Sequence, residues 1–378
     1  MAFFKKKIDY QPSAKEPAGD KTFLILTAAL SIFGLVALMS ASSAKSYLKY
    51  GDSYYIIKHQ LFGFCLGIAV FLIASKVSYA IWKKNAHYML FFSILLLLLV
   101  FIPGIRGDWG TARSWINIFG FSLQPSEFVK ISFLLYLAAW LEKRKGQLRD
   151  LGKGTAPFLF VLGVIAFLML LQPDFGTLSI IGASSLAVYF TSGGKIRHIS
   201  AIILVGAVCL FGLLQVKEYQ RDRFRCLIDP SFDTKRVCYQ ANQALIAVGS
   251  GGIFGRGLGA SRQKFSYLPE PTGDSIFAII AEETGFIVSA ILVLLYTALF
   301  VRGWKIAKNA ADDYGKILAL GLITWITLQA FINIGGIINL LPMTGVPLPF
   351  VSYGGSAIMS AMAAAGIIYN ISKYSRTR

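Results

Sequence analysis

Residues 23–43 read FLILTAALSIFGLVALMSASS, an apolar segment without a single charged side chain. About 20 residues of α-helix cross a bilayer, because the helix rises about 1.5 Å per residue and the hydrocarbon layer is about 30 Å thick. The apolar part of a signal peptide has only about 7–15 residues. We therefore expect an uncleaved first transmembrane helix that follows a Lys-rich cytoplasmic tail at residues 1–22.

Nine further apolar segments repeat this pattern along the chain. They lie near residues 56–75, 86–104, 123–141, 156–172, 175–192, 198–216, 276–301, 316–341 and 354–372. The fifth and sixth are separated at Gln172–Gly176, where Pro and Gly punctuate a region too long for one span. The segments are continuous rather than alternating, which disfavours a membrane barrel. The predicted fold is an all-α polytopic membrane protein with ten transmembrane helices.

The composition excludes a soluble enzyme and a disordered chain. Of the 378 residues, 55% are hydrophobic and 15% are charged, whereas soluble domains carry about 25% charged and about 45–50% apolar residues. The net charge of +18 would suggest a nucleic-acid partner in a soluble protein. Here we expect no nucleic acid, because the cytoplasmic loops of membrane proteins collect Lys and Arg.

The basic residues also predict the orientation. With the amino terminus inside, most of the 37 Lys and Arg residues fall in cytoplasmic segments, so both termini are expected inside. The resulting regions are the tail 1–22, helices one to seven in 23–216, one large extracytoplasmic loop at 217–275, helices eight to ten in 276–372, and a cytoplasmic tail at 373–378.

Charged residues at membrane depth are the first candidates for function, because each is costly unless it is paired. Glu127 and Lys130 are three residues apart in the fourth segment, on one helix face. They are interpreted either as a structural ion pair or as part of a polar cavity open to the outer leaflet. Asp174, in the break between the fifth and sixth segments, has the position of a helix cap, and a functional role is the alternative.

A second group of carboxylates lies where the large loop ends. Asp274 precedes the eighth segment, and Glu282 and Glu283 lie inside it. An Asp at a helix start is ordinarily a cap. Three carboxylates near one membrane face are also a candidate acid–base site, because crowding and partial burial raise carboxyl pKa values.

Three other features of the outer side suggest binding or structure. The Gly-rich residues 249–259 are not a P-loop, but with Arg256, Arg262 and Lys264 they could cradle a lipid diphosphate, a re-entrant loop being the alternative. The polar segment 333–356 should line a cavity, because broken backbone at membrane depth needs protein or water around it. Cys226 and Cys238 are a candidate disulfide if the compartment is oxidising, whereas the cysteines and histidines are too scattered for zinc.

Several of these segments form recognisable motifs. They are QPSEFVK at 124–130, LQPDFGT at 171–177, LPE at 268–270 followed by DSIFA at 274–278, AEETG at 281–285, and LPMTGVPLPFVSYGGS at 341–356. Together they resemble the SEDS family (shape, elongation, division and sporulation) over the whole chain, and its division branch, FtsW, more than its elongation branch, RodA.

The resemblance implies a peptidoglycan glycosyltransferase of ten spans in the bacterial cytoplasmic membrane. Such an enzyme polymerises lipid II, an undecaprenyl-diphosphate-linked disaccharide peptide, at the outer face. Asp274 matches the essential Asp of the family, and Glu127, Lys130 and Asp174 match positions that line its central cavity. One departure is the sequence EPTGD at 270–274, where many members have His-Thr before the Asp.

The chemistry assigns Asp274 as the general base that deprotonates the 4-hydroxyl of the acceptor N-acetylglucosamine. Direct displacement at the N-acetylmuramic acid donor would invert its anomeric carbon and release a polyprenyl diphosphate. The charge of this leaving group could be neutralised by a cation, either Mg²⁺ or Mn²⁺ or a side chain. The candidate residues for binding and for lining the cavity are Arg113, Lys130, Arg256, Lys264, Glu282, Ser352 and Ser356.

Two other functions stay open at this point. The first is a lipid II flippase, and the second is a non-catalytic scaffold that activates the usual partner of the family, a class B penicillin-binding protein transpeptidase, in a division or elongation complex. A flippase needs charges and openings on both membrane faces. The candidate residues cluster on the outer side, which favours the enzyme.

Overall fold

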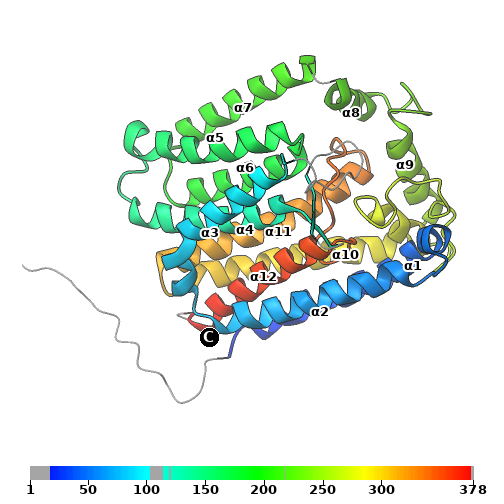
Figure 1. The fold of residues 1–378 in the computed structure, drawn as a ribbon, viewed down its shortest axis with the longest axis horizontal. Helices are drawn as coiled ribbons and strands as arrows, with labels where there is room; N and C mark the ends of the chain where they lie inside the picture. The colour runs from blue at the N-terminus through cyan, green and yellow to red at the C-terminus, as the bar shows by residue number, and fades with distance from the viewer. Residues whose placement is uncertain (1–17, 103–113, 119–120, 217, 376–378) are drawn as a thin grey trace, which may run out of the picture.

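The computed structural model describes residues 18–102, 114–118, 121–216 and 218–375. Each of the ten apolar segments coincides with a helix in this part of the chain. The helices are α1 (Lys21–Tyr50), α2 (Tyr55–Lys76), α3 (Tyr79–Leu99), α4 (Pro125–Lys143), α5 (Ala156–Leu171), α6 (Phe175–Thr191), α7 (Ile196–Val216), α10 (Ile276–Lys308), α11 (Asp313–Ile337) and α12 (Gly355–Lys373). They run side by side as a bundle (Figure 1).

The length and hydropathy of these helices identify a polytopic membrane protein. Among the described residues, 6 helices are long and apolar enough to cross a membrane, and α6 and the first part of α7 are shorter apolar helices. Helix α4 falls short of this criterion because it carries charged side chains at both ends, including Glu127 and Lys143. Its charges near the start are the pair singled out from the sequence.

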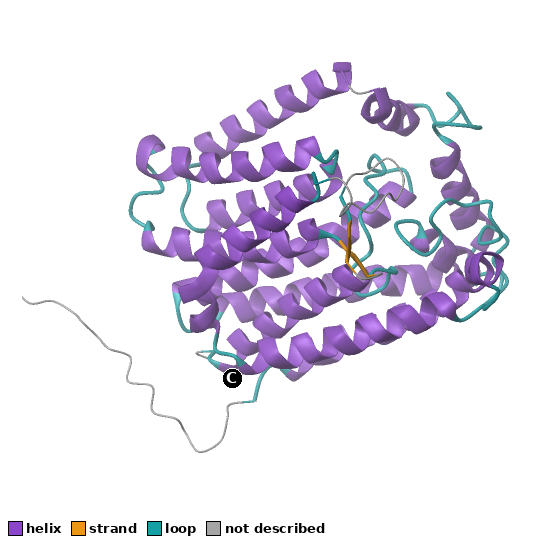
Figure 2. Cartoon of the chain, viewed as in Figure 1, coloured by secondary structure: helices purple, strands orange, loops and turns teal. Residues whose placement is uncertain are grey.

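Two short elements depart from the predicted all-α fold. Strands β1 (Ile116–Ile118) and β2 (Phe121–Leu123) form an antiparallel hairpin directly before α4 (Figure 2). A five-residue π-helix, η1 (Leu151–Thr155), leads into α5. Such short elements carry too few residues to leave a periodic pattern in the sequence.

Helices α11 and α12 form the centre of the bundle. Among the 18 most apolar consecutive residues of each helix, 72% are buried inside the protein in α11 and in α12, against 28% in α2. Helix α12 packs along α2, and α11 packs along α10, α6 and α4. The close approach of α2 and α12 requires Gly366, because a Cβ atom there would lie 2.7 Å from the carbonyl oxygen of Phe71.

The predicted outer loop is partly helical. It contains α8 (Glu218–Ile228) and α9 (Tyr239–Gly251), and these helices lie at the end of the bundle opposite the carboxyl terminus (Figure 1). The sulfur atoms of Cys226 and Cys238 are joined at 1.97 Å, so α8 is tied to the residue that directly precedes α9.

Helix α10 contains a break that the preceding loop fills. Gly285 has φ 75° and ψ −173°, a left-handed conformation that favours glycine. The freed backbone groups pair with the loop: Phe286 and Ile287 donate to the carbonyls of Gly252 and Ile253 at 2.9 and 3.3 Å, while Arg256 and Gly257 donate to those of Glu282 and Glu283, both at 3.0 Å. The amides of Arg256 and Gly257 therefore donate to α10, whereas the sequence suggested that the Gly-rich segment could cradle a phosphate.

Candidate active site

Asp274 lies at the junction of the long loop 217–275 and α10. Its carboxylate accepts hydrogen bonds from Nε2 of Gln240, at 3.3 Å to Oδ1 and 3.4 Å to Oδ2. The hydroxyl of Ser275 donates to Oδ1 at 3.4 Å. The N-cap residue of α10 is Ser275 rather than Asp274, so the simple capping role considered from the sequence is wrong.

The surroundings of Asp274 make its carboxylate unusually basic. Burial raises the pKa of Asp274 from the ordinary 3.8 to about 6, and the negative charge of Glu270 acts in the same direction. The guanidinium of Arg223 and the hydrogen bonds from Gln240 and Ser275 oppose this rise. A carboxylate with this pKa is mostly ionised at neutral pH and is a better proton acceptor than an ordinary Asp.

The segment between α11 and α12 holds the backbone around Asp274. Nδ2 of Asn333 donates to the carbonyl oxygen of Asp274 at 2.6 Å, and the hydroxyl of Ser352 donates to that of Gly273 at 2.7 Å. The amide of Tyr353 donates to the carbonyl of Thr272 at 2.8 Å. These three hydrogen bonds hold the backbone of residues 272–274 in place.

A small cavity opens beside the carboxylate. It is a shallow hollow of about 10 Å³, and its lining residues are Asp274, Asn333, Gly336, Ile337, Met343, Thr344 and Gly345. The expectation that the polar segment 333–356 lines a cavity is consistent with this arrangement. Arg223 reaches the same region from α8, where its Nη1 donates to the carbonyl of Met343 at 2.6 Å.

Glu127 and Lys130 form a buried ion pair in the bundle. Their charged groups are 2.7 Å apart, and their side chains are 2% and 1% exposed. Lys130 also donates to Oε1 of Gln329 at 2.7 Å and lies 4.8 Å from the ring centroid of Trp325, while Ser360 donates to Glu127 at 2.6 Å. Because the two charges are paired with each other and both side chains are buried, the cluster fits the interpretation as a structural ion pair.

The ion pair and the Asp274 region share one support. Nε2 of Gln329 donates to the carbonyl of Pro347 at 2.8 Å, and Nδ2 of Asn333, one turn further along α11, donates to that of Val346 at 2.8 Å. The segment that holds Asp274 is thus bound to the helix that contacts Lys130. Sequence reasoning missed Gln329 and Trp325, although Trp325, Gln329 and Asn333 recur every four residues on one face of α11.

Asp174 and Ser356 help to place the start of α4. Oδ1 of Asp174 accepts from the amide of Thr177 at 3.1 Å and so caps α6, as one interpretation of the sequence proposed, and Oδ2 accepts from Ser126 at 3.1 Å. The hydroxyl of Ser356 accepts from the amide of Gln124 at 3.2 Å. Both residues therefore act on the orientation of the helix that carries Glu127.

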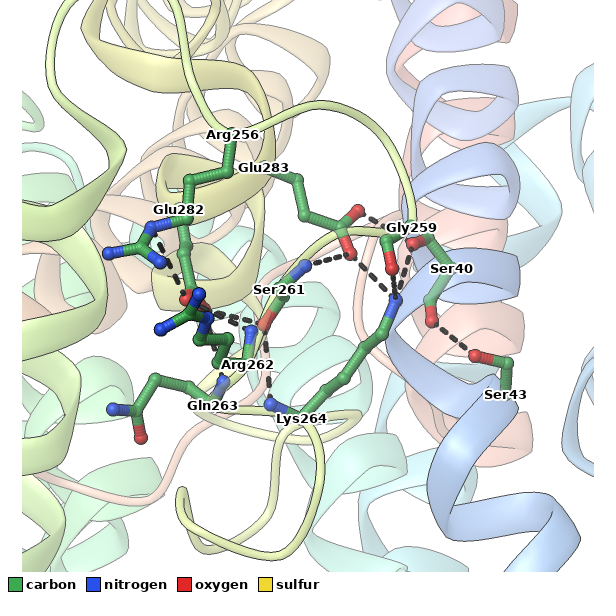
Figure 3. Close-up of polar contacts among 10 residues, drawn as sticks. All are labelled: Ser40, Ser43, Arg256, Gly259, Ser261, Arg262, Gln263, Lys264, Glu282 and Glu283. Atoms are coloured by element: carbon green, nitrogen blue, oxygen red, sulfur yellow. Dashed lines mark hydrogen bonds and ion pairs between the residues drawn. The ribbon is translucent and has the colours of Figure 1, made fainter.

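Glu282, Glu283 and Lys264 form a second buried cluster, separate from the contacts of Asp274 (Figure 3). Nζ of Lys264 donates to Oε1 of Glu283 at 2.9 Å and to the carbonyl of Gly259 at 2.8 Å. Oε2 of Glu283 accepts from Ser40 on α1 at 2.6 Å, and Oε2 of Glu282 accepts from Ser261 at 2.5 Å. The cluster fastens the loop to α10 and α1.

The remaining predicted cations lie elsewhere. Arg256 is partly exposed, with Nε 3.2 Å from the carbonyl of Ser250 and 3.9 Å from Oε1 of Glu282. The amide of Arg262 donates to the same oxygen at 3.0 Å. Arg113 lies outside the described residues. The cation that accompanies Asp274 is instead Arg223, which the sequence could not single out because its approach depends on how α8 folds back.

No described group of three or more His, Cys, Asp and Glu side chains is arranged to hold a metal ion. Mg²⁺ and Ca²⁺ sites are built from several oxygen ligands, whereas the carboxylates of the described clusters are each engaged by Lys, Arg, Gln or Ser donors.

The fold and the site together define a polytopic helical membrane protein with a basic carboxylate at one end of its bundle. The family profile FtsW/RodA/SpoVE, described as "Cell cycle protein", matches residues 20–377, and the chain belongs to this family.

Relatives and solved structures agree with that membership. Stage V sporulation protein E of Bacillus subtilis is 37% identical over 96% of this chain and 100% of its own length. A probable peptidoglycan glycosyltransferase FtsW of Geobacter metallireducens is 36% identical over 93% of this chain and 94% of its own length. The rod shape determining protein RodA of Thermus thermophilus superposes with a TM-score of 0.69 at 25% identity, covering 96% of this chain and 99% of RodA. A chain of a peptidoglycan synthase complex that coordinates polymerization and crosslinking gives 0.79 at 24% identity with the same coverage.

Proposed function

We propose that the chain is a peptidoglycan glycosyltransferase that polymerises lipid II, with Asp274 as its catalytic base. The observation that carries the proposal is the carboxylate of Asp274, held by Gln240 and Ser275 at a cavity, with a pKa raised by burial to about 6. Relatives named as probable peptidoglycan glycosyltransferases, at 36% identity over 93% of the chain, support the same reaction class.

The proposed reaction is a single displacement. Asp274 takes the proton from the 4-hydroxyl of the acceptor N-acetylglucosamine as its oxygen attacks the anomeric carbon of N-acetylmuramic acid. The bond from that carbon to the diphosphate oxygen breaks, and undecaprenyl diphosphate leaves with the electron pair. An α-linked donor gives a β-linked product, because the attack comes from the opposite face.

Arg223 is the side chain best placed to receive the negative charge of the leaving group. A Cβ atom at Gly345 would lie 3.6 Å from Oδ2 of Asp274 and 3.9 Å from Nη2 of Arg223, so both charged groups lie next to Gly345, which lines the cavity. A guanidinium fits diphosphate oxygens through paired hydrogen bonds. Lys130 and Lys264 are poor alternatives, since each is buried in an ion pair.

In the proposed topology, ten helices span the bacterial cytoplasmic membrane, with both termini and residues 141–155 inside and the loop 217–275 outside. The bias of Lys and Arg supports this orientation. An oxidising outer compartment would then suit a disulfide between Cys226 and Cys238. Single cysteines placed in the loop should react with an impermeant thiol reagent in intact cells, and cysteines at 141–155 should not. Labelling of cysteines at 141–155 in intact cells would contradict the proposed orientation.

The proposed biological setting is cell division together with a class B penicillin-binding protein transpeptidase. The resemblance to the division branch and the relatives named FtsW support this setting. A flippase or a purely activating scaffold is the second candidate, and the test of Asp274 separates them from the enzyme.

The test is the Asp274→Asn variant, purified with the partner and supplied with lipid II. Asn keeps the size of the side chain and can still accept from Gln240, but it cannot take a proton at neutral pH. We expect glycan strands on a gel to fall by about 10²–10⁴-fold, while membrane insertion and partner binding persist. A flippase should still move lipid II in this variant, and a scaffold should still activate its partner. The matched control is Glu218→Gln, which removes a carboxylate that is 84% exposed in the same loop. Polymerisation by the Asn variant at the wild-type rate would refute the assignment.

The pH dependence gives an independent check. If ionised Asp274 is the base, kcat/KM should rise with pH and level off above about 6. An ordinary Asp with a pKa of 3.8 would give a flat profile over the same range. A flat wild-type profile would therefore contradict the role of Asp274.

A further inference from the structure

Two residues that line the Asp274 cavity each carry a buried polar atom without a hydrogen-bond partner within the described protein. The atoms are Oδ1 of Asn333 and Oγ1 of Thr344, and both are buried. Their residues line the cavity together with Asp274. A buried polar atom without a partner costs about 1–3 kcal/mol, so such atoms are rarely left unsatisfied in a working protein.

The orientation of Asn333 is fixed by its neighbours. Its Nδ2 donates to two carbonyl oxygens, those of Asp274 at 2.6 Å and Val346 at 2.8 Å. Rotating the amide would turn Oδ1 toward both carbonyls and lose both hydrogen bonds. Oδ1 is therefore the end that is left without a partner, and it can only accept.

These groups determine which chemical groups a ligand would need in order to bind here. An amide oxygen repels a phosphate oxygen and requires an O–H or N–H donor, whereas a threonine hydroxyl both donates and accepts. The cavity is small, so it suits the edge of a molecule rather than a whole ring. A sugar hydroxyl fits all of these conditions, and a diphosphate does not.

We propose that Asn333 and Thr344 bind a hydroxyl of the acceptor sugar next to the hydroxyl that attacks, and so position the acceptor against Asp274. This inference rests on the proposed function. In N-acetylglucosamine the neighbours of the 4-hydroxyl are the 3-hydroxyl and the 6-hydroxyl. One of them donates to Oδ1 of Asn333 and pairs with Oγ1 of Thr344, which leaves the 4-hydroxyl at the carboxylate.

Gly345 keeps this approach open. It has φ 75°, and a Cβ atom there would lie 3.6 Å from Oδ2 of Asp274. A side chain at this position would be strained and would stand over the carboxylate. The residue after Thr344 therefore leaves room for a second group beside the base.

The decisive variant is Thr344→Val, which keeps the shape of the side chain and removes only the hydroxyl. Since this hydroxyl makes no hydrogen bond within the described protein, no internal bond is lost. We expect kcat/KM with lipid II to fall about three- to tenfold, the value of one neutral hydrogen bond. Thermal stability should stay the same or rise, and Thr344→Ser, which keeps a hydroxyl, should recover most of the activity.

Acceptor analogues provide the second arm. Two analogues of lipid II are compared, one lacking the 3-hydroxyl and one lacking the 6-hydroxyl of N-acetylglucosamine. With one of the two, the kcat/KM of the wild-type protein should fall about three- to tenfold, and with the other it should fall less. The Thr344→Val variant should show no further loss with the sensitive analogue. Wild-type protein that is indifferent to both analogues would overturn the proposal, even if Thr344→Val failed to fold.

The outcomes separate this inference from the catalytic assignment. If Thr344→Val retains wild-type kcat/KM, the orphaned atoms hold an ordered water and the proposal is wrong. If Thr344→Val is impaired as expected, its pH profile should keep the wild-type midpoint, because Asp274 is untouched. Failure of Asp274→Asn to abolish polymerisation would instead overturn the proposed function, whatever Thr344→Val does.

Discussion

Replacing Asp274 by Asn should make the folded protein more stable at neutral pH while it removes glycan synthesis. The reason is the raised pKa: burial and Glu270 disfavour the charged carboxylate in the folded state, so ionising it costs stability. Asn carries no charge and should keep the contact with Gln240. If the Asp274→Asn variant is more stable but inactive, Asp274 lowers the stability of the protein and is kept for its function.

The magnitude follows from the two pKa values. The gap between 3.8 and about 6 corresponds to about 3 kcal/mol at about 1.4 kcal/mol per pKa unit. Because the folded carboxyl has the higher pKa, the folded protein binds the extra proton between these values. The penalty is therefore absent well below pH 3.8, grows as the pH rises, and is complete above about 6. Partial exposure of Asp274 reduces the expected gain to about 1–3 kcal/mol.

The assay compares thermal unfolding of wild type and Asp274→Asn in one lipid nanodisc composition at several pH values. The advantage of the variant should increase by up to about 2 kcal/mol between about pH 4.5 and about pH 8. Using the difference between two proteins cancels the other titrating groups. Glu218→Gln should show no comparable change. An advantage that does not vary with pH, or that shrinks as the pH rises, would refute the reasoning.

Three further predictions follow from other parts of the structure. Glu127→Ala and Lys130→Met should each destabilise the protein by about 3–5 kcal/mol, because each leaves one buried charge unpaired. In thermal melts, the charge-swapped double variant should recover part of this loss. Full stability of both single variants would contradict a buried pair. Replacing Cys226 and Cys238 together by Ser should lower polymerisation more than it lowers membrane insertion, because the disulfide ties the helix of Arg223 to the helix of Gln240. Equal polymerisation by the wild-type protein with and without reductant would argue against a role of the disulfide. Gly285→Ala should reduce the yield of folded protein, measured by size-exclusion chromatography, because a Cβ atom there would collide with the backbone of Gly255, whereas Gly182→Ala, with open space around it, should be tolerated.

The positions of the helices were predictable because continuous apolar segments mark them. Each predicted segment coincides with a helix, although only 6 helices among the described residues are long and apolar enough to cross a membrane, and the break at Gln172–Gly176 separates α5 from α6. The pairing of Glu127 with Lys130 was also predictable, since residues three apart on a helix lie side by side. These features depend on contacts within one segment.

The environment of Asp274 was not predictable from local sequence. Gln240 reaches it because α9 packs against α10, and Arg223 reaches it from α8 while it donates to the carbonyl of Met343, and no periodic pattern encodes such contacts. The break at Gly285 was missed for a related reason. The sequence AEETG reads as continuous helix, and its interruption becomes visible only when the Gly-rich loop is seen to bond with its carbonyls.

The Gly-rich loop and the first half of α10 are joined by backbone hydrogen bonds, so residues 249–287 should be exchanged between relatives only as a whole. The amides of Arg256 and Gly257 replace the helix's own donors at Glu282 and Glu283. A chimera that takes this loop from one relative and the first half of α10 from another would bring together two backbones shaped for different partners. Productive chimeras within the family should therefore have their crossover points before residue 249 or after residue 287. Gly251, Gly255 and Gly285 should be retained in such chimeras, because a Cβ atom at any of them would collide with the backbone of the facing segment.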